Sequence, residues 1–141
     1  MKLKILQIKE ATEESATSAR VIADSMQEEA RADRECLWVL HLNTQLKVIE
    51  KELVAMGVLD AAYVQPREVF KKAILNSACS IITVHNHPSG EATPSANDKE
   101  IWHVLVKAGK LLGIPVIDNI ILGADGKFYS DKEEGLTGDY K

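Results

Sequence analysis

The chain has 141 residues, of which 45% are hydrophobic, so it can form one compact domain and gives no reason to expect a second. Its 21 Asp and Glu residues outnumber its 17 Lys and Arg residues, so its overall field does not attract nucleic-acid phosphates or anionic lipid. Strong nucleic-acid binding is therefore not expected, and any such contact would need a local basic patch.

The first residues, MKLKILQIKEATEES, return to charge too soon for a secretion signal or a membrane-spanning helix. Cys36 and Cys79 each lie in an apolar run, and their spacing fits neither a disulfide framework nor a CxxC metal site. We interpret both as core thiols in a reducing compartment. These features predict a cytoplasmic protein without a membrane segment.

The first half of the chain predicts one helix, a hairpin and a second helix. Residues 12–33 are rich in Ala, Glu, Gln and Arg without Gly or Pro, which favours a helix with a modest apolar stripe. The runs CLWVLHL (36–42) and LKVIEKELVAM (46–56) flank a short polar break and predict two paired strands. Pro66 suits the first position of an amphipathic helix that continues to about Ser77.

The second half predicts a strand, a helix and another strand. The β-branched run CSIITV (79–84) indicates a buried strand that stops at HNHPSGEATP. A helix is expected from Ser95 to Gly113, followed by a strand over 116–122 and a turn at GADG. This order predicts an α/β fold, a single domain with a mixed β-sheet flanked by helices. Residues 1–33 would form an N-terminal helical segment, and the polar residues 131–141 a mobile tail.

His85 and His87 are two residues apart at the end of a predicted strand, so their side chains point to the same side and can meet at one ion. Asp98, in the first turn of the next helix, can be carried back to them by the Pro-Gly-Pro loop. Two His and one carboxylate leave a fourth tetrahedral position for water, which is typical of a catalytic Zn²⁺ site. The sequence therefore predicts a zinc ion held by these three residues.

A purely structural interpretation of Asp98 competes with this one. Ser95-Ala96-Asn97-Asp98 is also similar to a helix capping box, in which the acidic residue is favoured near the positive end of the helix for reasons unrelated to metal. The combination of HxH, Pro88, Ser95 and Asp98 at this spacing is more specific than any one of its members.

The segment HNHPSGEATPSANDKE resembles the metal motif of the JAB/MPN (JAMM) metalloprotease superfamily, in its RadC branch. The similarity extends through PREVFKKAI, ITV and AGKLLGIPVIDNIILG, and covers about residues 34–130. It implies an MPN/JAB metal hydrolase domain of cytidine-deaminase-like architecture, with zinc as cofactor. The implied substrate is a peptide or protein, cleaved at a peptide or isopeptide bond.

The resemblance also implies roles for two catalytic residues. Glu35 matches the superfamily's upstream glutamate, which acts as general base and acid, and Ser95 matches the serine that helps to stabilise the oxyanion. Without the resemblance, Glu35 would be interpreted as a solvated carboxylate at a strand end. Glu50, Glu52 and Glu68 are alternative candidates for the proton-transfer residue.

Two departures from the RadC pattern bear on function. Asn119 stands where related sequences often have His, and only one helix is predicted where longer members carry a helix-hairpin-helix DNA-binding module. The open alternatives are a DNA-repair-associated or nuclease-like accessory protein and a metal-binding scaffold without catalysis. An exposed edge strand would make a homodimer plausible.

Charge gives a first prediction. Because an acidic chain without a basic stripe gains little from counterion release, we expect weak and non-specific DNA binding at most. A filter-binding or fluorescence titration with duplex and branched DNA at physiological salt measures this. Salt-sensitive binding tighter than about 1 µM would contradict the prediction and favour the DNA-repair alternative.

Overall fold

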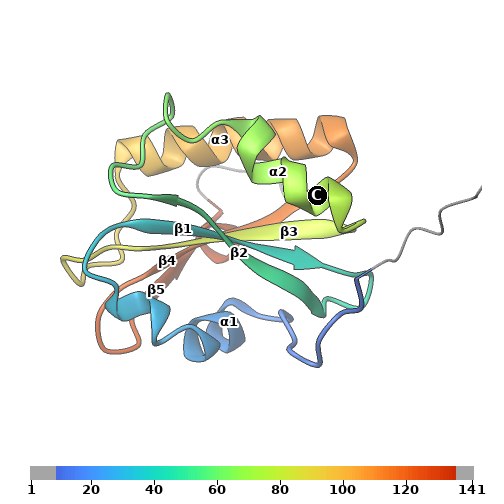
Figure 1. The fold of residues 1–141 in the computed structure, drawn as a ribbon. Coiled ribbons are helices and arrows are strands. Elements are labelled where there is room, and N and C mark those ends of the chain that lie inside the picture. Colours follow the sequence, from blue (N-terminus) through green and yellow to red (C-terminus); the bar gives the residue numbers. More distant parts are fainter. Residues whose placement is uncertain (1–8, 136–141) are drawn as a thin grey trace, which may run out of the picture.

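The computed structural model describes residues 9–135, and these form a central sheet between two layers of helices (Figure 1). The strands are β1 (Cys36–Leu42), β2 (Val48–Met56), β3 (Ser80–Asn86), β4 (Val116–Leu122) and β5 (Phe128–Ser130). The helices are α1 (Ala19–Ser25), the short 3₁₀ helix η1 (Glu29–Arg31), α2 (Pro66–Leu75), α3 (Ala96–Leu112) and α4 (Asp131–Glu134). In Figure 1, α2 and α3 cover one face of the sheet and α1 covers the other.

The sheet has the order β2-β1-β3-β4-β5 and is mixed. β1 is antiparallel to β2 and to β3, β3 is parallel to β4, and β4 is antiparallel to β5. α3 connects the parallel pair, as such a crossover requires. The predicted α/β fold with a mixed sheet flanked by helices is therefore confirmed.

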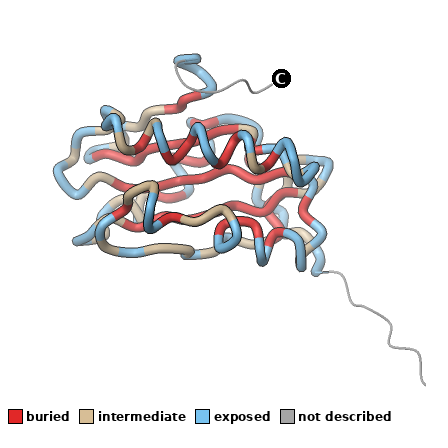
Figure 2. Tube along the Cα trace, turned by 90° about the horizontal axis from the view of Figure 1, so that it is seen from above, coloured by how far each residue is buried: buried red, intermediate tan, exposed pale blue. Residues whose placement is uncertain are grey.

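Both faces of the central strands are buried, because side chains alternate between two separate cores. Leu37 and Val39 of β1 belong to the apolar cluster on the α2 and α3 side, whereas Trp38 and Leu40 belong to the cluster on the α1 side. All seven residues of β1 and all seven of β3 are buried, and Figure 2 shows the central strands as continuously buried. This explains why β1 is almost entirely apolar, whereas the buried polar residues of β3 are Ser80, Thr83, His85 and Asn86.

The predicted hairpin and the elements at 66–75, 96–112 and 116–122 are present. The predicted helix over 12–33 is wrong in extent. The Thr12 amide donates to the carbonyl of Val48 (2.8 Å), and the Val48 amide donates to the carbonyl of Glu14 (2.9 Å). This segment therefore extends alongside the start of β2, and α1 begins only after Ser18, whose side chain accepts from the Val21 amide.

Three smaller predictions also need correction. β3 continues to Asn86, so His85 lies within the strand and not after it. Cys79 is exposed, since it lies in the turn between α2 and β3, and only Cys36 is a buried thiol. Residues 131–134 form α4 with Asp131 fully buried, so the predicted mobile tail does not begin at 131, and residues 136–141 lie outside the described part. No helix among residues 9–135 has the length and apolarity needed to cross a membrane.

A buried polar network at the α2 end of the sheet contains His41. Asn76 donates to its Nδ1 (2.9 Å), which places the ring proton on Nε2, 3.1 Å from the Glu52 carboxylate. Glu50, next to this group, pairs with the ammonium groups of Lys9 and Lys72 at 2.5 Å each. Burial of the ring lowers the pKa of His41 to about 4, although the charge of Glu50 opposes this effect. His41 is therefore a neutral structural residue at pH 7.

This shift makes stability depend on pH. Because the folded-state pKa of His41 lies below its ordinary value, the stabilisation is present above about pH 6.5 and lost as pH falls towards 4. We expect zinc-free wild type to lose about 1–2 kcal/mol more unfolding free energy between pH 7 and pH 5 than His41→Gln does. Urea denaturation of both proteins at the two pH values measures this, and equal losses would contradict it.

Candidate metal centre

The two histidines of HNH converge because His85 lies near the end of β3 and His87, two residues later, follows the strand directly and points to the same side. Leu37 of β1 pairs with His85, which fixes the register at this end of the sheet. The Nε2 atoms of His85 and His87 lie 3.2 Å apart, and the His85 side chain is 4% exposed and that of His87 13%. The Glu91 carbonyl oxygen, 2.8 Å from His87 Nδ1, fixes the orientation of the His87 ring. Its Nε2 therefore faces the cluster.

Asp98 reaches the histidines from the first turn of α3. Ser95 caps this helix, its Oγ accepting from the Asp98 amide (3.0 Å), while the Ser95 amide donates to Asp98 Oδ2 (2.8 Å). The same carboxylate lies 3.2 Å from His85 Nε2 through Oδ1 and 3.1 Å from His87 Nε2 through Oδ2. The capping box and the convergence on the histidines are therefore simultaneous, and the two interpretations of Asp98 are compatible.

The loop between the ligand-bearing elements is docked on the end of β4. The His87 amide donates to the carbonyl of Leu122 (3.0 Å), and the Ala124 amide donates to that of Gly90 (2.8 Å). Gly90 has φ +91°, and a Cβ on Gly123 would lie 2.5 Å from the Gly90 carbonyl oxygen. Only glycine permits this approach of the two loops, which holds the chain between His87 and Asp98 in place.

Electrostatics favour a cation at this position. Burial would raise the pKa of Asp98, but hydrogen bonds from His85 and His87 outweigh it and hold that pKa well below its usual range. The hydrogen bond to Asp98 raises the pKa of His87 despite the opposing effect of burial, and the charge of Glu35 adds to the rise. Within residues 9–135, this His-His-Asp group is the one cluster of three His, Cys, Asp or Glu residues whose ligand atoms all lie within 4.8 Å of one another. It can hold a metal ion.

Glu35 lies beside this cluster. It is two residues before Leu37, the partner of His85, so it lies on the same face as the histidines. Its backbone carbonyl accepts from the Gly57 amide (2.8 Å), and its side chain is half-buried. The alternatives lie elsewhere: Glu50 pairs with His41, four residues or about 13 Å along β1 from Leu37.

Trp102, Asn119 and His103 lie outside the His-His-Asp cluster. Trp102 does not line an open groove: it is buried, 6.0 Å from the His85 ring and stacked on Tyr129 at 5.9 Å. Asn119 is buried beneath the site and accepts a hydrogen bond from Thr83. His103 is exposed on α3. The support that Trp102 gives His85 was missed, because its spacing from His85 carries no signal in the sequence.

A cavity of about 280 Å³ opens next to His87. Its walls come from the segment around η1, from the loop after β3 and from the turn between β4 and β5; its lining residues are Gln27, Ala30, Arg31, Ala32, His87, Pro88, Gly90, Gly123, Ala124 and Asp125. Of the three residues of the candidate metal centre, His87 borders this cavity.

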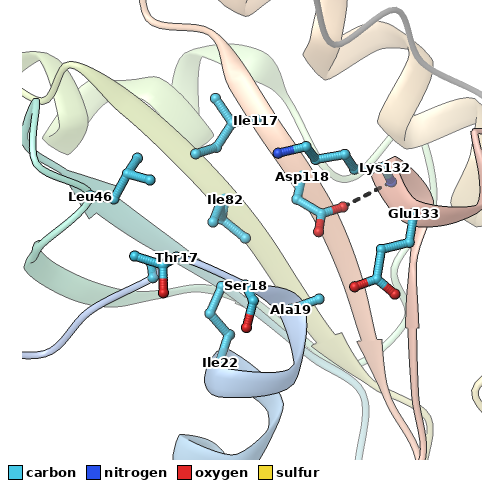
Figure 3. Close-up of a pocket in the computed structure, with 11 residues that line it drawn as sticks. Thr17, Ser18, Ala19, Ile22, Leu46, Ile82, Ile117, Asp118, Lys132 and Glu133 are labelled. Carbon is cyan, nitrogen blue, oxygen red and sulfur yellow. Dashed lines mark hydrogen bonds between the residues drawn. The ribbon is translucent and has the colours of Figure 1, made fainter.

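A second cavity, of about 270 Å³, lies on the α1 face and is shown in Figure 3. Its most polar member, Asp118, has its carboxylate occupied by the Ser130 hydroxyl (2.7 Å) and by the amides of Asn119 (2.7 Å) and Lys132 (3.0 Å). Because these bonds fix the carboxylate within the fold and the sheet separates it from His85, this cavity adds nothing to the metal centre.

Comparison with known proteins identifies the family to which this chain belongs. The model of the RadC-like JAB domain family matches residues 12–136. A UPF0758 protein of Desulforudis audaxviator is 50% identical over 111 residues, which cover 79% of this chain and 48% of the relative. The UPF0758 protein TTE0897 of Caldanaerobacter subterraneus subsp. tengcongensis is 48% identical over 122 residues, 86% of this chain and 52% of the relative. The chain thus spans about half the length of these curated relatives.

The cluster predicts metal binding that depends on Asp98. We expect the protein, purified without chelators, to carry about one divalent metal ion per chain, and Asp98→Asn to lose most of it. Asn keeps an oxygen that can accept the Ser95 amide, so this variant removes the charge and preserves the helix cap. Elemental analysis gives the stoichiometry, with His103→Ala as the control that retains metal. Metal-free wild type, or full occupancy in Asp98→Asn, would refute the assignment.

Proposed function

Since the chain belongs to the RadC-like JAB domain family, we propose that it is a zinc-dependent hydrolase of peptide or isopeptide bonds. The observation that carries the proposal is the convergence of His85, His87 and Asp98, of which His87 borders a cavity. Three protein ligands leave a coordination position for water or substrate, which distinguishes a catalytic site from a closed structural one.

The spacing of the ligand atoms supports zinc. A tetrahedral Zn²⁺ ion with bonds of about 2.0–2.1 Å has its ligand atoms about 3.3 Å apart. The Nε2 atoms of His85 and His87 lie 3.2 Å apart, and each lies 3.1–3.2 Å from one oxygen of Asp98, Oδ1 for His85 and Oδ2 for His87. Two imidazole ligands beside a single carboxylate suit zinc better than magnesium, which prefers oxygen ligands. When bound, zinc would polarise the scissile carbonyl and make a water molecule acidic near neutral pH.

Glu35 supplies the proton transfer that amide hydrolysis needs. Water adds to the carbonyl carbon as the carboxylate of Glu35 accepts one of its protons; the C–N bond then breaks, and Glu35 returns the proton to the leaving amine. The second proton of the water stays on the acyl product, so the step yields a carboxylic acid and an amine, which become carboxylate and ammonium near neutral pH, and Glu35 ends in its starting state. Its position on the face of His85 and His87, beside the Leu37 pairing, suits this role.

Ser95 can support the oxyanion without giving up its role as helix cap. A hydroxyl has one donor and two acceptor sites, and the capping bond uses Oγ only as an acceptor from the Asp98 amide. Its O–H proton therefore remains to donate to a negatively charged oxygen next to the metal centre. The exposure of Ser95 leaves this side of the centre open to substrate.

The cavity next to His87 is the proposed position of the substrate residue beside the scissile bond. It is bordered by the polar side chains of Gln27, Arg31 and Asp125 and by exposed loop backbone. Peptide groups of an extended substrate find donors and acceptors in such a lining. A peptide or protein is therefore the substrate class that we propose.

Glu35→Gln separates catalysis from metal binding. We expect this variant to keep wild-type zinc content while turnover falls by about 10²–10⁴-fold, because only the general base is lost. Ser95→Ala should also keep zinc and lose turnover, by about 10²-fold. Screening against peptide and isopeptide libraries, with kcat and zinc measured in parallel, tests this.

Glu68→Gln, which changes an exposed glutamate on α2, is the matched control and should behave as wild type. Unchanged turnover in Glu35→Gln with zinc bound would exclude Glu35 as the base. A zinc-loaded wild type that cleaves no amide would favour a scaffold.

A further inference from the structure

The middle residue of HNH, Asn86, faces away from the metal centre. Because side chains alternate along β3, His85 and Asn86 point to opposite faces of the sheet, and His87, directly after the strand, meets His85. Asn86 is 0% exposed, and its amide makes three hydrogen bonds to the backbone that leads into β1. A buried amide with all these bonds made holds its partners in a defined place.

The partners of Asn86 are the peptide groups on both sides of Glu35. Its Nδ2 donates to the Arg34 carbonyl (3.0 Å), which belongs to the peptide that enters Glu35. Its Oδ1 accepts from the Cys36 amide (2.8 Å), which belongs to the peptide that leaves Glu35. Each peptide is planar, so fixing both of them fixes the two backbone dihedral angles of Glu35 and the direction of its Cα–Cβ bond.

Two further bonds complete this arrangement. Asn86 Nδ2 also lies within reach of the Ala32 carbonyl (3.3 Å), and the Glu35 carbonyl accepts from the Gly57 amide on the opposite side (2.8 Å). The regular pairing of β1 with β3 ends at Leu37 and His85, so beyond that pair the Asn86 side chain takes over from the main-chain ladder.

We propose that Asn86 is a positioning residue that sets the carboxylate of Glu35 relative to His85 and His87. The end of β3 and the residue after it then carry, in three consecutive residues, the two histidine ligands and Asn86, whose hydrogen bonds to the backbone around Glu35 we call the clamp. The geometry of the base relative to the metal is therefore fixed by one short segment of backbone. This inference rests on the proposed function for its catalytic consequence, but the clamp itself does not depend on it.

The chemistry of the clamp calls for an amide. One acceptor must face the Cys36 amide while a donor faces the carbonyls of Arg34 and Ala32. Asp supplies the acceptor but places its second oxygen against two carbonyl oxygens, and Ser supplies one donor on a shorter side chain. Asn86→Asp and Asn86→Ser therefore break different halves of the clamp, and neither removes a proposed metal ligand.

The first test uses zinc-free protein and needs no substrate. In wild type we expect the Glu35 amide to be rigid, with an NMR order parameter of about 0.85, and the Cys36 amide to be protected from hydrogen exchange. In Asn86→Ser the order parameter should fall below about 0.7 and Cys36 exchange should rise by about tenfold or more. Asn76→Ser, which removes an amide from the His41 network, is the matched control and should change neither value.

The second test is a double-mutant cycle on the zinc-loaded enzyme. We expect Asn86→Ser to keep its zinc and its KM while kcat falls by about 10- to 100-fold, the cost of a misplaced catalytic group. In the Glu35→Gln background the same change should alter kcat by less than about threefold, because the group that it positions is already gone.

Equal losses of kcat in the two backgrounds, or an unchanged Glu35 order parameter, would overturn the proposal. If wild type cleaves no amide, the proposed function fails, and the order parameter and the exchange rate still decide whether Asn86 holds Glu35.

Discussion

The buried carboxylate of Asp98 is the interaction on which the rest of the site depends. A charge removed from water is costly unless hydrogen bonds and opposite charge compensate it. Asp98 is 4% exposed, and its partners are the Ser95 amide and the imidazoles of His85 and His87. The start of α3 and the two histidines are therefore held by one side chain. A shift of either would leave the buried Asp98 carboxylate without some of its hydrogen-bond partners.

The two imidazoles share the compensation between the two oxygens of this carboxylate. His85 Nε2 lies 3.2 Å from Oδ1, and His87 Nε2 lies 3.1 Å from Oδ2. These hydrogen bonds outweigh burial, which would otherwise raise the pKa of Asp98. The two Nε2 atoms also lie 3.2 Å from each other, so two imidazole nitrogens and a carboxylate face one point, and such a group can bind a cation.

The sequence predicted the elements that follow simple periodicity and missed those set by tertiary pairing. Short segments rich in apolar and β-branched residues identified β1, β3 and β4, and the Ser95 cap identified the start of α3. The convergence of His85, His87 and Asp98 could be expected from a two-residue spacing on a strand and a short loop. The extension of residues 12–15 along β2 could not, because hydrogen bonds to Val48 outweigh the helical propensity of that segment.

The sequence analysis assigned a role to Glu35 only through a family resemblance. The position of Glu35 beside the histidines could not be predicted from the residues around it. Glu35 lies 50 residues before His85, and its placement follows from the Leu37 pairing and from the Asn86 side chain, two long-range contacts. The contacts of Asn86 could not be predicted either, because an Asn between two His residues has no distinctive sequence pattern. Polar side chains that satisfy backbone groups of a distant segment leave no periodicity to detect.

The N-terminal segment, set apart from the hydrolase domain on sequence grounds, takes part in the site. Its α1 covers one face of the sheet, and the residues around η1, including Gln27 and Arg31, form a wall of the cavity next to His87. Ala32 both lines that cavity and accepts a hydrogen bond from Asn86. The cavity wall and the backbone that leads to Glu35 are thus continuous through Ala32, so a shift of this wall would also change a hydrogen bond of Asn86.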